Sequence, residues 1–125
     1  MSKLLFLFNI CILISFNVSA ENWVKYNSEG SWVDGDSIII LKNPKRVIFN
    51  TKSISSYYQE GYIYITTGIL CNSGKRYSID AYVADNGKRI AQSDPSTLNI
   101  ETDMIPGSFD TVMYKAKCLG EKTVR

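Results

Sequence analysis

The chain contains no histidine, and this absence removes most of the familiar catalytic arrangements. Ser–His and Cys–His nucleophile pairs are unavailable, and so is the commonest general base. Gly-rich phosphate-binding motifs are absent as well. The acidic residues have ordinary interpretations: Asp34 and Asp36 flank a glycine, as turn residues do. Asp80, Glu101 and Asp103 resemble surface carboxylates. We therefore expect a protein that is not an enzyme, with no catalytic residue and no cofactor.

Charge of one sign is nowhere concentrated. Three basic pairs, Lys45-Arg46, Lys75-Arg76 and Lys88-Arg89, are spread along the chain and flank expected strands or turns. Lys3 is the only basic residue before position 21, so residues 21–125 carry 13 of the 14 basic and all 12 acidic side chains, a net charge of +1. Nucleic-acid binding needs a concentrated basic surface. We expect no nucleic-acid partner.

Long apolar runs are scarce, and the longest, Leu4 to Phe16, is interrupted by polar residues. A membrane-spanning helix needs about 20 apolar residues, so this run is too short. Val18-Ser19-Ala20 supplies the small residues of a signal-peptidase site, and we expect residues 1–20 to be a signal peptide cleaved after Ala20. Lipid attachment at Cys11 is disfavoured, because this cysteine lies midway through the apolar run. Residues 21–125 are then one exported domain without a transmembrane segment.

Cysteine is also rare, with three in the whole chain. Loss of the signal peptide removes Cys11 and leaves Cys71 and Cys118. Two thiols without histidine do not make a zinc site, and their separation does not fit a Cys-x-x-Cys redox motif. In an oxidising compartment they are expected to form one structural disulfide and no metal site.

The rest of the chain reads as strands joined by short turns. Asn72-Ser73-Gly74 and Asp85-Asn86-Gly87 have the chemistry of tight hairpin turns, because Asn and Gly tolerate positive φ. They predict an antiparallel meander from Tyr62 through Ala84 to Ser93. The C-terminal stretch instead repeats apolar residues with helical spacing, at Phe109, Val112, Met113 and Ala116. Ser108 is the expected N-cap, and Gly120 is placed to end this helix.

Strand periodicity assigns the side chains to two faces of the sheet. One face is expected to carry Val47, Phe49, Ile63, Ile65, Ile69, Cys71, Tyr77, Ile79, Ala81 and Val83. We expect the helix to lie across this face, with Cys118 tied to Cys71. The fold class is therefore α+β: a small antiparallel sheet of about five to six strands, with one C-terminal helix fixed to one face by a disulfide.

The second face is expected to carry large side chains with no helix to cover them. They are Ile48, Tyr62, Tyr64, Leu70 and Tyr82, beside Arg76, Ser78 and Asp80. One interpretation is that they pair across strands, or that the sheet curls and buries them. The other is a contact face for a second copy of the chain or for a macromolecular partner, which Tyr57 and Tyr58 in the preceding loop could extend.

Several motifs together resemble the surface-adhesin protein E family of Gram-negative bacteria. They are WVKY after the signal peptide, SWVDGDSI, a mid-chain cysteine that closes a strand, and IPGSFDTVMYKAKC near the end. The resemblance covers essentially all of residues 21–125, and it implies an antiparallel sheet with a disulfide-tethered C-terminal helix. It also implies an outer-surface protein that binds host matrix or serum proteins and forms dimers. The chain departs from the family in lacking a lipidation cysteine at the cleavage point and in having Thr102-Asp103-Met104 where many relatives place a Trp.

Two functional classes follow from these observations. The first is an exported cell-envelope binding protein of the adhesin type, located in the periplasm or on the outer surface of a Gram-negative bacterium. The second is a periplasmic inhibitor or immunity-type protein that blocks an enzyme with a loop or a sheet face. The motif residues of the resemblance build the fold, and none of them is a known ligand-binding residue.

Overall fold

The protein is described from a computed structural model, which covers residues 21–54 and 61–121. The predicted signal peptide, with its cleavage site after Ala20, and the loop tyrosines Tyr57 and Tyr58 lie outside these residues. The strands are, in chain order, β1 (Trp23–Asn27), β2 (Ser31–Asp34), β3 (Ile39–Leu41), β4 (Arg46–Ile54), β5 (Tyr62–Leu70), β6 (Lys75–Asp85), β7 (Lys88–Gln92) and β8 (Thr102–Asp103). Two 3-10 turns, η1 (Gly35–Ser37) and η2 (Pro95–Thr97), and the helix α2 (Phe109–Lys117) complete the described chain.

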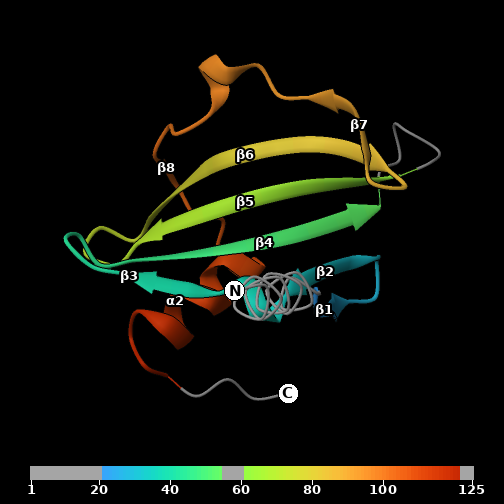
Figure 1. Cartoon of the computed structure of the whole chain (residues 1–125). Coiled ribbons are helices and arrows are strands. Elements are labelled where there is room, and N and C mark those ends of the chain that lie inside the picture. Colours follow the sequence, from blue (N-terminus) through green and yellow to red (C-terminus); the bar gives the residue numbers. More distant parts are fainter. Residues whose placement is uncertain (1–20, 55–60, 122–125) are drawn as a thin grey trace, which may run out of the picture.

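The described strands form one antiparallel sheet in the order β1-β2-β4-β5-β6-β7 (Figure 1). The short strands β2 and β3 follow each other along the same edge of β4, and β8 pairs with the start of β6. The described residues therefore contain eight strands, and the expected number of five to six is wrong. The difference comes from short strands such as β8, which pair over two or three residues and leave little periodic pattern in the sequence.

The predicted meander of β5, β6 and β7 is confirmed. Gly74 follows the β5–β6 turn with φ +74°, and Asn86 and Gly87 close the β6–β7 hairpin with φ of +52° and +79°. These positive values require residues that tolerate the left-handed region, which is why the Asn-Gly pair could be recognised in the sequence.

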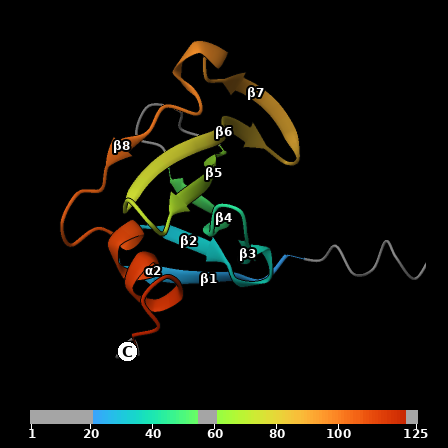
Figure 2. The ribbon, with the colours of Figure 1, turned by 90° about the vertical axis from the view of Figure 1, so that its left-hand side faces the viewer.

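Helix α2 packs on one face of the sheet, beside β1 and β2 (Figure 2). The core beneath it is formed by Val33, Val47, Phe49, Ile69 and Met113. Met113 is 5% exposed, whereas Val112 of the same predicted stripe is 38% exposed. The predicted Cys71–Cys118 disulfide is confirmed, with its two Cα atoms 5.2 Å apart, and it joins the end of the helix to the end of β5.

A β-bulge changes the predicted assignment of faces along β6. Thr66 pairs with Asp80 but Thr67 pairs with Ser78, so one residue of β6 is skipped between them. N-terminal to this point the alternation of β6 is inverted. Tyr77, which we expected under the helix, therefore stands opposite Gly68 on the other face.

The same bulge moves Arg76 and Ser78 to the helix side of the sheet. There the Arg76 guanidinium donates to the Asp110 carboxylate of α2 at 2.8 Å. The expected positions of Tyr77, Arg76 and Ser78 are thus wrong for one shared reason, a register shift that periodicity within a single strand does not reveal.

Candidate interaction face

The face of the sheet away from the helix gathers three tyrosines at one end. Tyr64 of β5 pairs directly with Tyr82 of β6, and their rings stack with centroids 5.2 Å apart and planes inclined by 13°. Tyr62 lies two residues along β5, so its side chain points to the same face, and its ring centroid is 6.3 Å from that of Tyr64. The side chains are half-buried by one another.

Two tryptophans extend this cluster onto β1 and β2. Trp23 meets Tyr64 edge to face with the centroids 6.0 Å apart, and Trp32 meets Tyr62 in the same way at 5.7 Å. We call Trp23, Trp32, Tyr62, Tyr64 and Tyr82 the aromatic array. Sequence reasoning missed both tryptophans as members of the face. Their position follows from β2 pairing with β4, a long-range contact.

Cations are interleaved with the rings. The Lys52 ammonium lies 4.7 Å from the ring centroids of both Trp23 and Tyr62 and 5.5 Å from that of Trp32. At the other end, the Arg89 guanidinium of β7 stacks on Tyr82 at 3.7 Å. Such pairs are attractive because the positive charge faces the negative quadrupole of the ring. The aromatic array and these two cations therefore come from six strands, β1, β2, β4, β5, β6 and β7.

Ile48 and Leu70 lie on the predicted face but not in the aromatic array. Leu70 is six residues from Tyr64 along β5, which corresponds to about 20 Å of strand. Ile48 pairs with Gly68 and also stands opposite Ile39 of β3, whose side chain is 47% exposed. The five predicted contact residues therefore form two separate patches, with polar residues between them.

A polar cleft of about 200 Å³ occupies this middle region, beside the aromatic array. Its aromatic lining comes from Trp23, Tyr64 and Tyr82. Its polar lining comes from Glu21, Asn50, Thr51, Thr66, Asp80 and Arg89. The Thr66 hydroxyl donates to Asn50 Oδ1 at 2.8 Å, and the Arg89 guanidinium donates to Asp80 at 3.2 Å.

The environment of the array favours the neutral form of Tyr64. Burial raises the pKa of its hydroxyl above the ordinary 10.0, and the nearby Glu21 carboxylate raises this pKa further. Glu21 is held in place because Trp23 Nε1 donates to its Oε1 at 2.8 Å. The Tyr64 hydroxyl is protonated at neutral pH, as an ordinary tyrosine is, and can donate a hydrogen bond.

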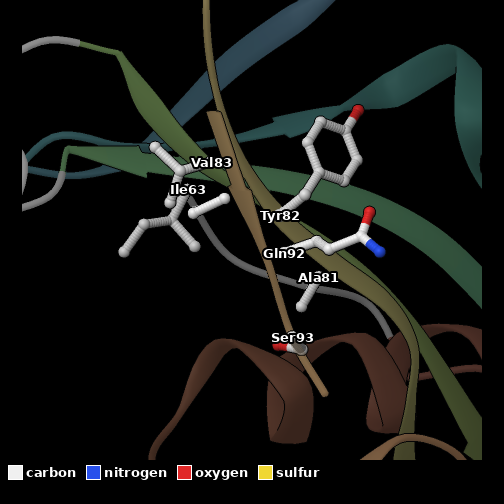
Figure 3. Close-up of a pocket in the computed structure, with 7 residues that line it drawn as sticks. Ile63, Ala81, Tyr82, Val83, Gln92 and Ser93 are labelled. Atoms are coloured by element: carbon white, nitrogen blue, oxygen red, sulfur yellow. The ribbon is translucent and has the colours of Figure 1, made fainter. Parts of the chain in front are cut away.

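Two further clefts are mainly apolar. One, of about 210 Å³, is lined by residues of β5, β6 and β7 and by Ser93, which follows β7 (Figure 3). Figure 3 shows Ile63 and Val83 on one side of the strands and Tyr82 and Gln92 on the other, as the alternation of a sheet requires. The second, of about 220 Å³, lies between α2 and β1 and includes Val24 and Val112.

The SWVDGDSI motif has a structural role. Asp34 is 7% exposed, and its carboxylate accepts the backbone N–H groups of Asn22 and Asp36 at 3.0 and 3.1 Å. Asp34 caps η1, which confirms the interpretation of Asp34 and Asp36 as turn residues.

Across residues 21–54 and 61–121, no group of three His, Cys, Asp or Glu side chains is placed to hold a metal ion. None of the helices in that part of the chain has the length and apolarity needed to cross a membrane. Comparison with models of protein families, with curated proteins and with solved structures finds no match to this chain. The site must therefore be interpreted from its own geometry.

Proposed function

We propose that this chain is an exported cell-envelope binding protein, of the kind that its resemblance to the surface-adhesin protein E family implies. Its partner is a macromolecule such as a host matrix or serum protein. The observation that carries this proposal is the aromatic array. Five Trp and Tyr rings gather on the face of the sheet away from α2, and each of them is partly exposed.

The composition of the array supports this role. Trp and Tyr are enriched at the energetic centres of protein interfaces, because they bury a large area while losing little side-chain entropy. The rings here are packed against one another before any partner arrives, so little further ordering accompanies binding. Pre-organisation of this kind raises affinity by lowering the cost of association.

The proposal is tested by measuring binding of the purified exported protein to immobilised matrix and serum proteins. We expect the Tyr62→Glu, Tyr64→Glu double variant to lose binding, because two carboxylates would be placed among the rings. Ile105→Glu is the matched control, since Ile105 is 74% exposed in the segment before α2 and lies outside the array. Equal binding by the parent and the double variant would show that the aromatic array is not the binding surface.

The cellular location is tested separately. Protease treatment of intact cells should degrade an adhesin that reaches the outer surface. A protein protected from the protease and recovered in complex with an envelope enzyme would instead support the inhibitor class. Light scattering of the parent and the double variant tests whether a second copy of the chain occupies the same face.

A further inference from the structure

The polar cleft beside the aromatic array presents hydrogen-bonding groups whose orientation is fixed. Because the Thr66 hydroxyl donates to Asn50 Oδ1, the orientation of the Asn50 side chain is set, and Asn50 brings an N–H₂ group that can donate to the lining of the cleft. The ion pair of Arg89 with Asp80 engages one carboxylate oxygen and one guanidinium nitrogen. The second Asp80 oxygen and the other Arg89 N–H groups keep the capacity to bind a ligand.

The charges in and around the cleft nearly cancel. Glu21 and Asp80 contribute two carboxylates and Arg89 one guanidinium, and the Lys52 ammonium lies 4.7 Å from the ring of Trp23, which also lines the cleft. Among these groups, no excess of either charge is present to attract an ion. The groups offered are instead a mixture of donors and acceptors, which suits a neutral ligand with many hydroxyls.

The size and the aromatic wall restrict the ligand further. A volume of about 200 Å³ lies below the roughly 300–1,000 Å³ of pockets for drug-sized molecules, so one small ring fills it. Trp23, Tyr64 and Tyr82 line the same cleft as these polar groups. The Tyr82 ring is stacked on Tyr64 and lies against the Arg89 guanidinium, so aromatic carbon and hydrogen-bonding groups are mixed in the lining. A sugar ring combines apolar C–H groups with hydroxyls that both donate and accept.

We propose that this cleft binds one neutral sugar ring of a glycan carried by the macromolecular partner. The proposal rests on the proposed function and specifies the chemistry of the partner at that site. The aromatic array then contacts the partner's surface, while the neighbouring cleft recognises the attached sugar.

The test is an NMR titration of the exported protein, labelled with ¹⁵N, by neutral trisaccharides of glucose, mannose, galactose and N-acetylglucosamine. We expect at least one to shift the Trp23 indole N–H and the Asn50 side-chain N–H₂ signals at millimolar concentrations. Thr66→Val and Asp80→Asn keep the side-chain shape and should each weaken binding by about threefold or more, the effect of one lost hydrogen bond. Thr102→Val, on the exposed strand β8, is the matched control and should leave the affinity unchanged.

Three results would overturn this inference: no shift with any trisaccharide, shifts confined to another part of the molecule, or unchanged affinity in both cleft variants. Thermal melting of each variant checks that the variant is folded. If a variant is not folded, the titration of the parent alone decides whether the cleft binds a sugar. Failure here is distinguishable from failure of the proposed function. The control is a glycoprotein ligand from which the glycans have been removed enzymatically. If it still binds the parent but not the Tyr62→Glu, Tyr64→Glu variant, the array is supported and the sugar site is rejected.

Discussion

Arg76 of β6 donates to Asp110 in the first turn of α2 at 2.8 Å, and both side chains are about three-quarters buried, with 25% and 23% exposure. This ion pair and the disulfide fix opposite ends of the helix to the sheet. The Arg76 guanidinium also contacts the Ser78 hydroxyl at 3.2 Å, so its orientation is set from two sides. The helix is therefore positioned by polar contacts as well as by its apolar stripe.

Asp110→Asn should lower the free energy of unfolding by about 1–3 kcal/mol, because it leaves a largely buried guanidinium without its counter-charge. The matched control is Asp103→Asn. Asp103 also pairs with a cation, Lys75, at 2.9 Å, but its side chain is 87% exposed. An exposed pair of this kind contributes little to stability. Urea unfolding of both variants measures the difference, and equal losses would mean that the buried pair has no special role.

Removal of the disulfide should be more damaging than loss of the ion pair. The bond closes a separation of 47 residues, and the chain-entropy model assigns about 4 kcal/mol to a loop of that length. Cys118→Ser, or reduction of the parent, should therefore lower stability by about 2–5 kcal/mol. The measurement is the unfolding midpoint with and without reductant. An unchanged midpoint would show that the core beneath α2 holds the helix without its tether.

The features that the sequence predicted correctly are those set by local chemistry. The Asn86-Gly87 pair favours positive φ because of its own chemistry. The 3.6-residue period of the helix places Met113 on its apolar face. Neither inference depends on the rest of the chain. The disulfide followed from counting the cysteines of an exported chain. None of these inferences required knowledge of which strands are neighbours.

The features that were missed depend on pairing between distant strands. The bulge opposite Thr66 and Thr67 is a property of two strands, so alternation within β6 could not place Tyr77 or Arg76. Trp32 joins the array because β2 pairs with β4, which the sequence does not specify. The separation of Leu70 from the tyrosines, however, could have been estimated from strand rise alone.

Gly68 is required because the Tyr77 ring of the neighbouring strand lies directly over it. A Cβ at position 68 would collide with the Tyr77 ring. Gly68→Ala should therefore destabilise the protein by about 1–3 kcal/mol, the usual cost of overpacking. In a Tyr77→Ala background the same substitution should be neutral or stabilising, because the obstacle is gone and Gly is unfavourable in a strand. A double-mutant cycle from urea unfolding measures this coupling, and additive effects would contradict it.

Stability should decline on the alkaline side as tyrosines ionise. Burial raises the pKa of Tyr64 and of Tyr26 above their ordinary 10.0. Above about pH 10 the unfolded chain therefore binds fewer protons than the folded chain, and the free energy of unfolding falls as pH rises. The stabilising contribution is fully present below pH 10. Tyr64→Phe should make the decline above about pH 10 shallower, as followed by urea unfolding at each pH, and an unchanged slope would reject this assignment.

The last prediction concerns Lys52, whose ammonium lies among three rings of the aromatic array. Lys52→Met keeps an unbranched chain of similar length but removes the charge. It should lower the free energy of unfolding by about 1–2 kcal/mol, because the cation–π attraction is lost. The matched control is Lys25→Met, because the Lys25 ammonium lies over a single ring, Trp32, at 5.7 Å, and should cost less than about 0.5 kcal/mol.

Tryptophan fluorescence provides an independent measurement of the same change. The chain has two tryptophans, and both belong to the aromatic array, so the emission reports on this face alone. We expect Lys52→Met to shift the emission and to leave far-ultraviolet circular dichroism unchanged, because the sheet stays paired while the charge between the rings is lost. Equal stability and emission in Lys52→Met and the parent would mean that the rings hold their arrangement by packing against one another, with no contribution from the cation between them.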